Sequence, residues 1–271
     1  MTDAPRLTDR TALLRNRARA LRDPALFLHE TALEELQDRL GMVNRSFTNP
    51  AIVTGFPDFW TKAFPDATVV PDEEVLCLSE GAHDLVIHAM SLQWANDPVG
   101  QIIQCRRALK PDGFFLAALF GGQTLSQLRT ALAEAEVERT GGLSPRILPM
   151  AEIRDLGGLL QRAGLSLPVA DNLALNVSYQ TPFHLMRDLR AMGESNALAG
   201  RARHATRPSI LTRAAEIYQA HHSDDSGRIL ATFELVFLTG WSPDSSQPQP
   251  LRPGSATNRL AEVLGTQETK L

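Results

Sequence analysis

An acidic turn at residues 72–74, with the sequence Asp-Glu-Glu, carries the side chains best suited by type and position to ligand binding. It follows a short apolar segment at 67–70 that is typical of a buried strand. Asp72 lies 17 residues after Gly55, near the separation of roughly 20 residues at which a carboxylate meets a ribose hydroxyl in dinucleotide-binding folds. Open α/β sheets bind ligands beyond the carboxyl ends of their strands, so a carboxylate is well placed there. The alternative is a solvated acidic turn, and the sequence favours neither.

A second polar segment, residues 192–196 with the sequence Met-Gly-Glu-Ser-Asn, also has the character of a site. Gly, Ser and Asn present backbone groups and short polar side chains, although the segment could equally be the C-terminus of a helix. Trp94 is interpreted as core or as the wall of a pocket rather than as a catalyst. Gly121 and Gly122 follow a predicted strand and could expose backbone to a ligand or form a plain turn.

Histidine and cysteine residues offer few further sites. His88 lies in an apolar run and is interpreted as a hydrogen-bonded core histidine rather than as a base. His221 and His222 are adjacent and would not share a helix face, which argues against a metal pair. Cys77 and Cys105 have no base nearby in the sequence, and two cysteines cannot build a four-cysteine zinc site. No metal site is predicted.

The elements that position these residues follow from apolar patterns and turn signals. Strands are predicted at 51–54, 67–70, 84–89, 114–120 and 229–238, and helices at 24–40, 56–64, 98–109, 125–140, 153–163, 182–192 and 209–218. Asp23, Asp97 and Thr124 are the expected N-caps of three helices, and residues 111–113 are a predicted turn. Strands that alternate with helices at this spacing indicate an α/β fold with a mostly parallel sheet.

Composition sets the class of protein. The 271 residues are 43% hydrophobic and 21% charged, with a formal net charge of −4. These values argue against global disorder and against a dedicated nucleic-acid binder. No apolar run approaches the ~18 residues of a membrane-spanning helix, so no transmembrane segment is expected. We expect a bacterial cytoplasmic protein that is at most peripheral to the inner membrane.

Three regions are predicted along the chain. Residues 1–22 form a solvated N-terminal arm or helix, because Asp3 and Asp9, with Asp23 directly after them, make this start too acidic for a transit peptide. Residues 23–241 form the main domain, and the segment 242–271 is a tail rich in proline and serine.

Several sequence blocks resemble one superfamily. The runs 84–87, 91–98 and 108–115, the last reading Ala-Leu-Lys-Pro-Asp-Gly-Phe-Phe, resemble the fourth strand, following helix and fifth strand of class I S-adenosylmethionine (SAM)-dependent methyltransferases. Further blocks at 120–125, 141–145, 155–164, 192–196 and 254–256 are similar to one branch. That branch contains the biotin-pathway (BioC-type) malonyl-carrier O-methyltransferase and a mitochondrial complex I assembly factor that hydroxylates an arginine of an iron–sulfur subunit.

The resemblance implies a Rossmann-like class I methyltransferase fold with a reduced, mostly parallel sheet and a helical substrate-covering portion at about 123–149 and 181–222. It implies a SAM-dependent methyltransferase-like protein acting on a protein substrate, such as a respiratory complex I subunit, during complex I maturation. The cofactor-binding residues that it implies are Gly55, Asp72, Glu73 and Ala89, with Asp72 facing the adenine. It assigns no catalytic residue.

The first motif of the superfamily is altered in this chain. Val53 stands where the superfamily has an acid, Gly55 is the one remaining glycine, and Pro57 and Phe59 occupy loop positions that are usually small or polar. The stretch from Gly55 to Asp72 is also too short for two strand–helix units, so the second strand is expected to be missing. The competing hypothesis is therefore a non-catalytic methyltransferase-fold assembly factor that binds a protein partner and has lost SAM binding.

A nicotinamide-dependent oxidoreductase ranks last, because the chain has no Gly-x-Gly-x-x-Gly fingerprint. The transferase hypothesis requires a nucleotide-sized hollow beside the carboxyl ends of the first strands. Phe56, Phe59 or Trp60 filling that hollow would favour a scaffold role instead.

Overall fold

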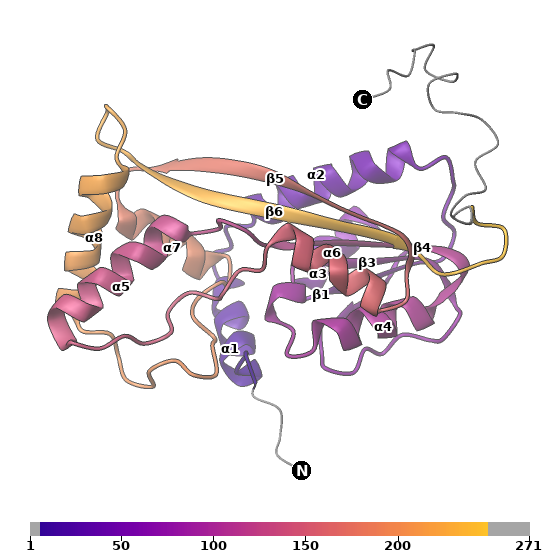
Figure 1. The fold of residues 1–271 in the computed structure, drawn as a ribbon, viewed down its shortest axis with the longest axis horizontal. Helices are drawn as coiled ribbons and strands as arrows, with labels where there is room; N and C mark the ends of the chain where they lie inside the picture. The colour runs from indigo at the N-terminus through magenta and orange to yellow at the C-terminus, as the bar shows by residue number, and fades with distance from the viewer. Residues whose placement is uncertain (1–5, 249–271) are drawn as a thin grey trace, which may run out of the picture.

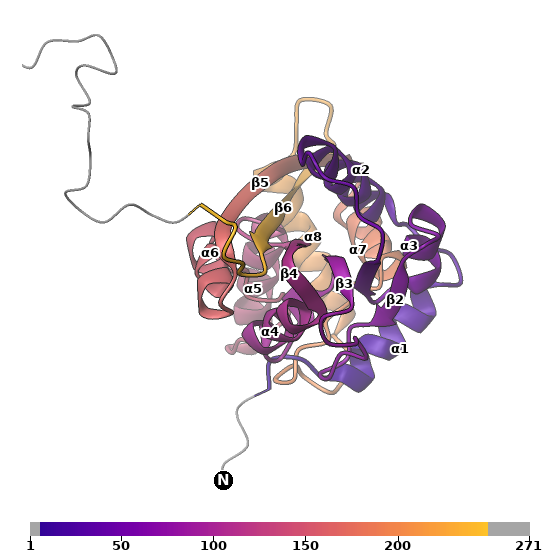
Figure 2. The same ribbon diagram turned by 90° about the vertical axis from the view of Figure 1, so that its right-hand side faces the viewer.

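The computed structural model describes residues 6–248, which form a six-stranded sheet covered by helices on both faces (Figures 1 and 2). The strands are β1 (Pro50–Thr54), β2 (Thr68–Pro71), β3 (His83–Ala89), β4 (Leu109–Phe120), β5 (Ser166–Tyr179) and β6 (Ile229–Trp241). The α-helices are α1 (Arg10–Ala20), α2 (Phe27–Met42), α3 (Pro57–Ala63), α4 (Pro98–Ala108), α5 (Ser126–Thr140), α6 (Ile153–Arg162), α7 (Pro182–Ala191) and α8 (Pro208–His222), with a 3-10 turn η1 (Leu92–Trp94) after β3. Most of the predicted tail lies outside the described residues.

The parallel half of the sheet, in the order β2-β1-β3-β4, sets the place of the site. Thr54 at the end of β1 is level with Pro71 of β2 and with Ala89 of β3, so the carboxyl ends of these strands align. All seven residues of β3 are buried, as expected for a strand covered on both faces. β2 pairs directly with β1, and the single short helix α3 connects them, which confirms the predicted reduced sheet.

Helices pack on both faces of this sheet. α2 and α3 bury Leu36 and Trp60 against one face, while α4 and α6 bury Ile102 and Leu160 against the other. This arrangement is the doubly wound architecture that alternating strands and helices predict. Among the described residues no helix is both long and apolar enough to cross a lipid bilayer.

The antiparallel half of the sheet, β5 and β6, packs with α5, α7 and α8 at one end of the molecule (Figure 1). β6 pairs with β4 over its second half and with β5 over its whole length. The β5–β6 pair extends past the parallel strands to α5, α7 and α8, as Figure 1 shows. These three helices fall within the segments proposed as a substrate-covering portion.

Three local predictions were incomplete or wrong. β5 was not predicted, although Leu173, Leu175 and Val177 pack on the core while the residues between them are exposed, the period of two of a half-covered strand. The predicted turn at 111–113 is a bulge inside β4, because His83 pairs with Leu109 while Leu85 already pairs with Phe114. Two of the three predicted N-caps are wrong. Asp23 caps no helix, since α2 begins at Phe27 after the backbone of Ala25 has bonded to Ala191. Thr124 does not cap α5, whose N-cap is Leu125, and the Thr124 hydroxyl donates to the Gly121 carbonyl instead.

Candidate functional site

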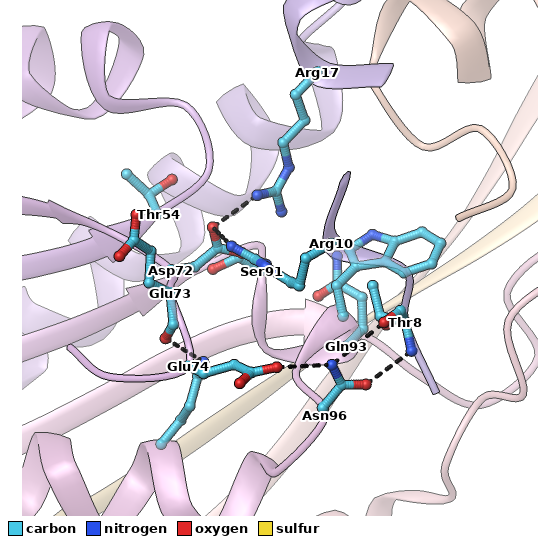
Figure 3. Close-up of polar contacts among 12 residues, drawn as sticks. Thr8, Arg10, Arg17, Thr54, Asp72, Glu73, Glu74, Ser91, Gln93 and Asn96 are labelled. Atoms are coloured by element: carbon cyan, nitrogen blue, oxygen red, sulfur yellow. Dashed lines mark hydrogen bonds and ion pairs between the residues drawn. The ribbon is translucent and has the colours of Figure 1, made fainter. Parts of the chain in front are cut away.

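Three of the four predicted cofactor-binding residues meet at one edge of the sheet. Gly55 follows β1, Asp72 follows β2, and Ala89 ends β3, so the strand register brings them together. We call the space between these three residues the strand-edge site. Glu73 is not part of it, because its side chain is exposed and its backbone carbonyl accepts a hydrogen bond of 2.9 Å from Gln101 Nε2. Figure 3 shows the polar contacts of this region.

Helix α1 lies against this edge, which corrects the prediction of a solvated N-terminal helix. Its buried face includes Leu13, Arg17 and Ala20, which recur at helical spacing. Asp9 caps the helix by accepting a hydrogen bond of 3.1 Å from the Ala12 backbone N–H. The side chain of Asn16 donates a hydrogen bond of 2.9 Å to the Ser195 carbonyl. The helix therefore belongs to the folded domain.

Arg17 of this helix occupies the strand-edge site (Figure 3). Its Nη1 donates to Asp72 Oδ1 over 2.7 Å, and the two side chains are only 5% and 3% exposed. A Cβ atom at Gly55 would overlap the Arg17 guanidinium, so the guanidinium lies directly over the glycine backbone. Arg10 adds two longer contacts of 3.3 Å to the same carboxylate.

The ion pairs hold Asp72 in its charged form. Burial alone would raise the pKa of Asp72, but the positive charges and hydrogen bonds of Arg17 and Arg10 bring that pKa below its ordinary value. The charge of Arg17 is therefore compensated inside the protein. Its Nε and Nη2 atoms are buried without a hydrogen-bond partner, so the guanidinium uses part of its donor capacity.

The residues of the strand-edge site do not fit SAM. The superfamily motif requires a glycine backbone open to the cofactor and an aspartate free to face adenine, whereas here one arginine covers Gly55 and binds Asp72. Phe56 and Trp60 are buried at 2% and 0% exposure, and Trp60 Nε1 lies 3.3 Å from His29 Nδ1. These aromatic residues thus form core beside the site, and the side chain that fills it is Arg17.

A separate cavity of about 380 Å³ lies next to this site. Gln93 and Trp94, from the turn η1 after β3, line it together with Glu194. We call it the Glu194 cavity. Its remaining wall is largely apolar and comes from the end of β4, α5, the loop after α5, α7, the loop 195–206, α8 and β6, and it includes Phe120, Leu128, Leu148, Met186, Leu211 and Phe233.

Glu194 gives this cavity its chemistry. Trp94 Nε1 donates to Glu194 Oε2 over 2.7 Å. Burial raises the pKa of Glu194 to about 7, against the opposing effects of the Arg17 charge and of the Trp94 hydrogen bond. Gln93 Nε2 donates to the Met90 carbonyl over 3.2 Å, while Gln93 Oε1 is buried without a partner. The cavity wall therefore presents the Glu194 carboxyl group to a donor-rich ligand, beside the Gln93 side chain, whose buried Oε1 has no partner within the protein.

The cationic side chains in the cavity wall already have partners. Arg146 binds Glu136 over 2.6 Å, and Arg201 binds Asp9 over 2.9 Å. With these charges balanced locally, Glu194 sets the electrostatic preference of the cavity.

Sequence reasoning located part of this site. Trp94 lines a pocket, as one of its two interpretations predicted, and the polar segment 192–196 contributes Glu194. His88 is a satisfied core histidine, with Nε2 2.7 Å from Gln101 Oε1. Arg17 and Gln93 were missed. The spacing of Arg10, Leu13 and Arg17 on one helix face was the signal that could have revealed the first. Among residues 6–248 no group of His, Cys, Asp and Glu side chains is arranged to hold a metal ion.

The chain is similar to two groups of proteins of described function. It is 37% identical to the mitochondrial arginine-hydroxylase NDUFAF5 of Danio rerio over 222 residues, which cover 82% of this chain and 69% of that protein. It is 38% identical to NDUFAF5 of Dictyostelium discoideum over 195 residues, 72% of this chain but only 45% of the relative. It is also 34% identical to the malonyl-[acyl-carrier protein] O-methyltransferase of Halorhodospira halophila over 173 residues, 64% of this chain and 57% of that enzyme.

Solved structures share the fold. The YcgJ protein of Bacillus subtilis superposes with a TM-score of 0.50 at 9% identity, over 78% of this chain and 99% of that structure. No family model matches the sequence. Together with the strand order, these similarities show a Rossmann-like, methyltransferase-type α/β fold.

Proposed function

We propose a function from one premise: the chain belongs to the family of the arginine-hydroxylase NDUFAF5, which the 37% identity across 69% of the Danio rerio protein shows. It is a methyltransferase-like protein, related also to the malonyl-[acyl-carrier protein] O-methyltransferases. The chain spans about half of the Dictyostelium discoideum relative, so activity, substrate and partner are proposed here on the chemistry of the site.

The proposed function is recognition of an arginine side chain on a protein partner, a subunit of respiratory complex I during its assembly. The observation that carries it is the Glu194 carboxyl group in the wall of a largely apolar cavity, next to Gln93, whose Oε1 has no hydrogen-bond partner within the protein. A guanidinium group has five N–H donors and no acceptor, so it suits a site whose free groups are acceptors. A carboxylate also binds it with charge-assisted hydrogen bonds.

The shape of the cavity supports the same ligand. Its volume of about 380 Å³ lies within the range of small-molecule and side-chain pockets. Its apolar wall, from Phe120, Leu128 and Met186, suits the methylene groups of an arginine stem. Arg146 and Arg201 are held away from Glu194 by their own carboxylate partners, so neither neutralises it by a direct ion pair.

Calorimetric titration with blocked arginine tests this proposal. Acetyl-arginine-methylamide should bind the wild-type chain, while acetyl-citrulline-methylamide, a neutral isostere, should bind much more weakly. Glu194→Gln should weaken arginine binding by about 10- to 100-fold, the worth of a hydrogen bond to a charged group. Glu152→Gln, at an exposed glutamate, serves as the matched control. Equal binding of arginine and citrulline would contradict the proposal.

Co-purification tests the partner. A complex I subunit should be recovered with the tagged wild-type chain from cells of its source, and Glu194→Gln should reduce the recovery. If the substitution leaves the recovery unchanged, the subunit is not bound through Glu194, which contradicts the proposal. We further propose a cytoplasmic location in contact with the inner membrane where complex I is assembled, which cell fractionation tests.

A further inference from the structure

We infer that Arg17 permanently replaces the cofactor in this chain, so that the strand-edge site is a closed ion-pair centre and the protein works without SAM. This inference concerns the site beside the Glu194 cavity and does not depend on the ligand proposed for that cavity.

The first ground is that Arg17 fills the space that the cofactor would need. The guanidinium lies over the Gly55 backbone, where the superfamily motif needs open space, and it binds Asp72, the residue expected to face the adenine. The same side chain therefore takes both of the contacts that the cofactor would need. The aliphatic part of the Arg17 side chain packs closely against the Gly193 backbone. A Cβ atom at Gly193 would lie 3.1 Å from Arg17 Cγ and 3.0 Å from Phe56 Cζ.

The second ground is the shortened chain around the site. β2 pairs directly with β1, and only α3 connects them. β2 is the one described strand beyond β1 on this side of the sheet, Asp72 is the acid that follows it, and Val53 stands where the superfamily has the acid of the first strand. The sheet edge thus keeps Asp72 as its acid at this point, and the positive charge brought by α1 balances that acid.

The third ground is that α1 is fixed at several points. Asp9, its N-cap, binds Arg201 over 2.9 Å. The Thr8 backbone N–H donates to Asn96 Oδ1 over 2.8 Å (Figure 3). The side chain of Asn16 donates to the Ser195 carbonyl over 2.9 Å. Moving α1 away from the sheet edge would break these contacts together with the Arg17–Asp72 ion pair, so the helix is built as a fixed part of the site rather than as a lid.

Arg17 then acts as a positioning residue for the neighbouring cavity. It packs on Gly193, the residue before Glu194, and its positive charge opposes the burial that raises the pKa of Glu194. The Arg17 guanidinium therefore supplies a fixed positive charge beside the cavity.

Ligand binding and chemical rescue on the full chain test the inference. S-adenosylhomocysteine at millimolar concentration should neither raise the Tm of the wild-type chain nor give heat in calorimetry. Arg17→Ala should lower the Tm, and ethylguanidinium should restore part of that loss, whereas the neutral analogue ethylurea should not. Arg15→Ala, at an exposed arginine on the same helix, should lower the Tm little and show no rescue.

Two further variants locate the rescue. It should disappear in Arg17→Ala/Asp72→Asn, because the carboxylate that holds the guanidinium is gone. It should persist in Arg17→Ala/Glu194→Gln, which separates the strand-edge site from the Glu194 cavity. The inference is overturned if the wild-type chain binds S-adenosylhomocysteine with submillimolar affinity, whether or not the Arg17 variants fold. It is also overturned if ethylguanidinium raises the Tm of wild type and Arg17→Ala alike.

Discussion

Replacing Asp72 by asparagine removes the negative charge that compensates Arg17 and keeps nearly the same side-chain shape. Asp72 and Arg17 are joined over 2.7 Å, and both side chains are almost fully buried. Arg17 would be left with an uncompensated charge in the interior, while Arg10, with 19% of its side chain exposed, can turn toward solvent.

The expected loss is large for one substitution. Removing one partner of a buried ion pair costs about 3–5 kcal/mol of the free energy of unfolding. The variant Arg17→Met/Asp72→Leu should be more stable than Asp72→Asn, because two apolar side chains of similar size leave no charge unpaired. Asp58→Asn, on the exposed side of α3, is the matched control and should change stability by about 0.5 kcal/mol or less.

The assay is urea unfolding followed by circular dichroism, measured at several pH values. The pKa of Asp72 is lowered by folding, so its contribution is present above the unfolded value of 3.8 and is lost as the pH falls through the lower folded value. The difference between wild type and Asp72→Asn should therefore be constant near neutral pH and shrink below about pH 3.8. A loss near neutral pH no greater than that of Asp58→Asn would refute the buried pair.

Other side chains give independent predictions, each measured by urea unfolding or by the titration of one carboxyl group. Folding raises the pKa of Glu194 from 4.5 to about 7, so wild type should lose stability relative to Glu194→Gln as the pH rises from 4.5 to 7; a constant difference would exclude the shift. Trp94→Phe removes the indole donor and should raise the pKa of Glu194 further, as carbon NMR of the carboxyl group would show. Glu136, whose pKa falls to about 2, accepts hydrogen bonds from Ser144 and Arg146, so Glu136→Gln should cost about 1–3 kcal/mol. That cost should vanish as the pH falls from 4.5 toward 2, while Glu134→Gln, at an exposed glutamate of the same helix, should have little effect.

The strand edge could be predicted from local sequence because its signals are local. An apolar run such as 84–89 specifies a strand buried on both faces, and parallel strands align their carboxyl ends. Gly55, Asp72 and Ala89 therefore meet as the βαβ pattern implied. The polar segment 192–196 was found for a similar reason, since its residue types are unusual at the end of a helix.

The occupant of that edge could not be predicted in the same way. The spacing of Leu13 and Arg17 could place Arg17 on the buried face of its helix. Arg17 and Asp72 are 55 residues apart in the chain, however, and no local pattern shows which carboxylate the arginine meets. The sequence analysis named Phe56 and Trp60 as the side chains that could fill the cofactor site, because they are large, but Arg17 fills it. Phe56 and Trp60 are instead buried in the core with His29, through the packing of α2 against α3, which the local sequence does not specify.

The state of Arg17 in the presence of SAM tests the central claim most directly. In a sample with isotope-labelled arginine, the NMR signal of the Arg17 Nη1–H group, which donates to Asp72, reports a guanidinium held against that carboxylate. We predict that this signal stays at the same position and intensity when SAM is added to millimolar concentration, and that it moves in Asp72→Asn. Movement of the wild-type signal toward that of a free arginine side chain on adding SAM would contradict the account.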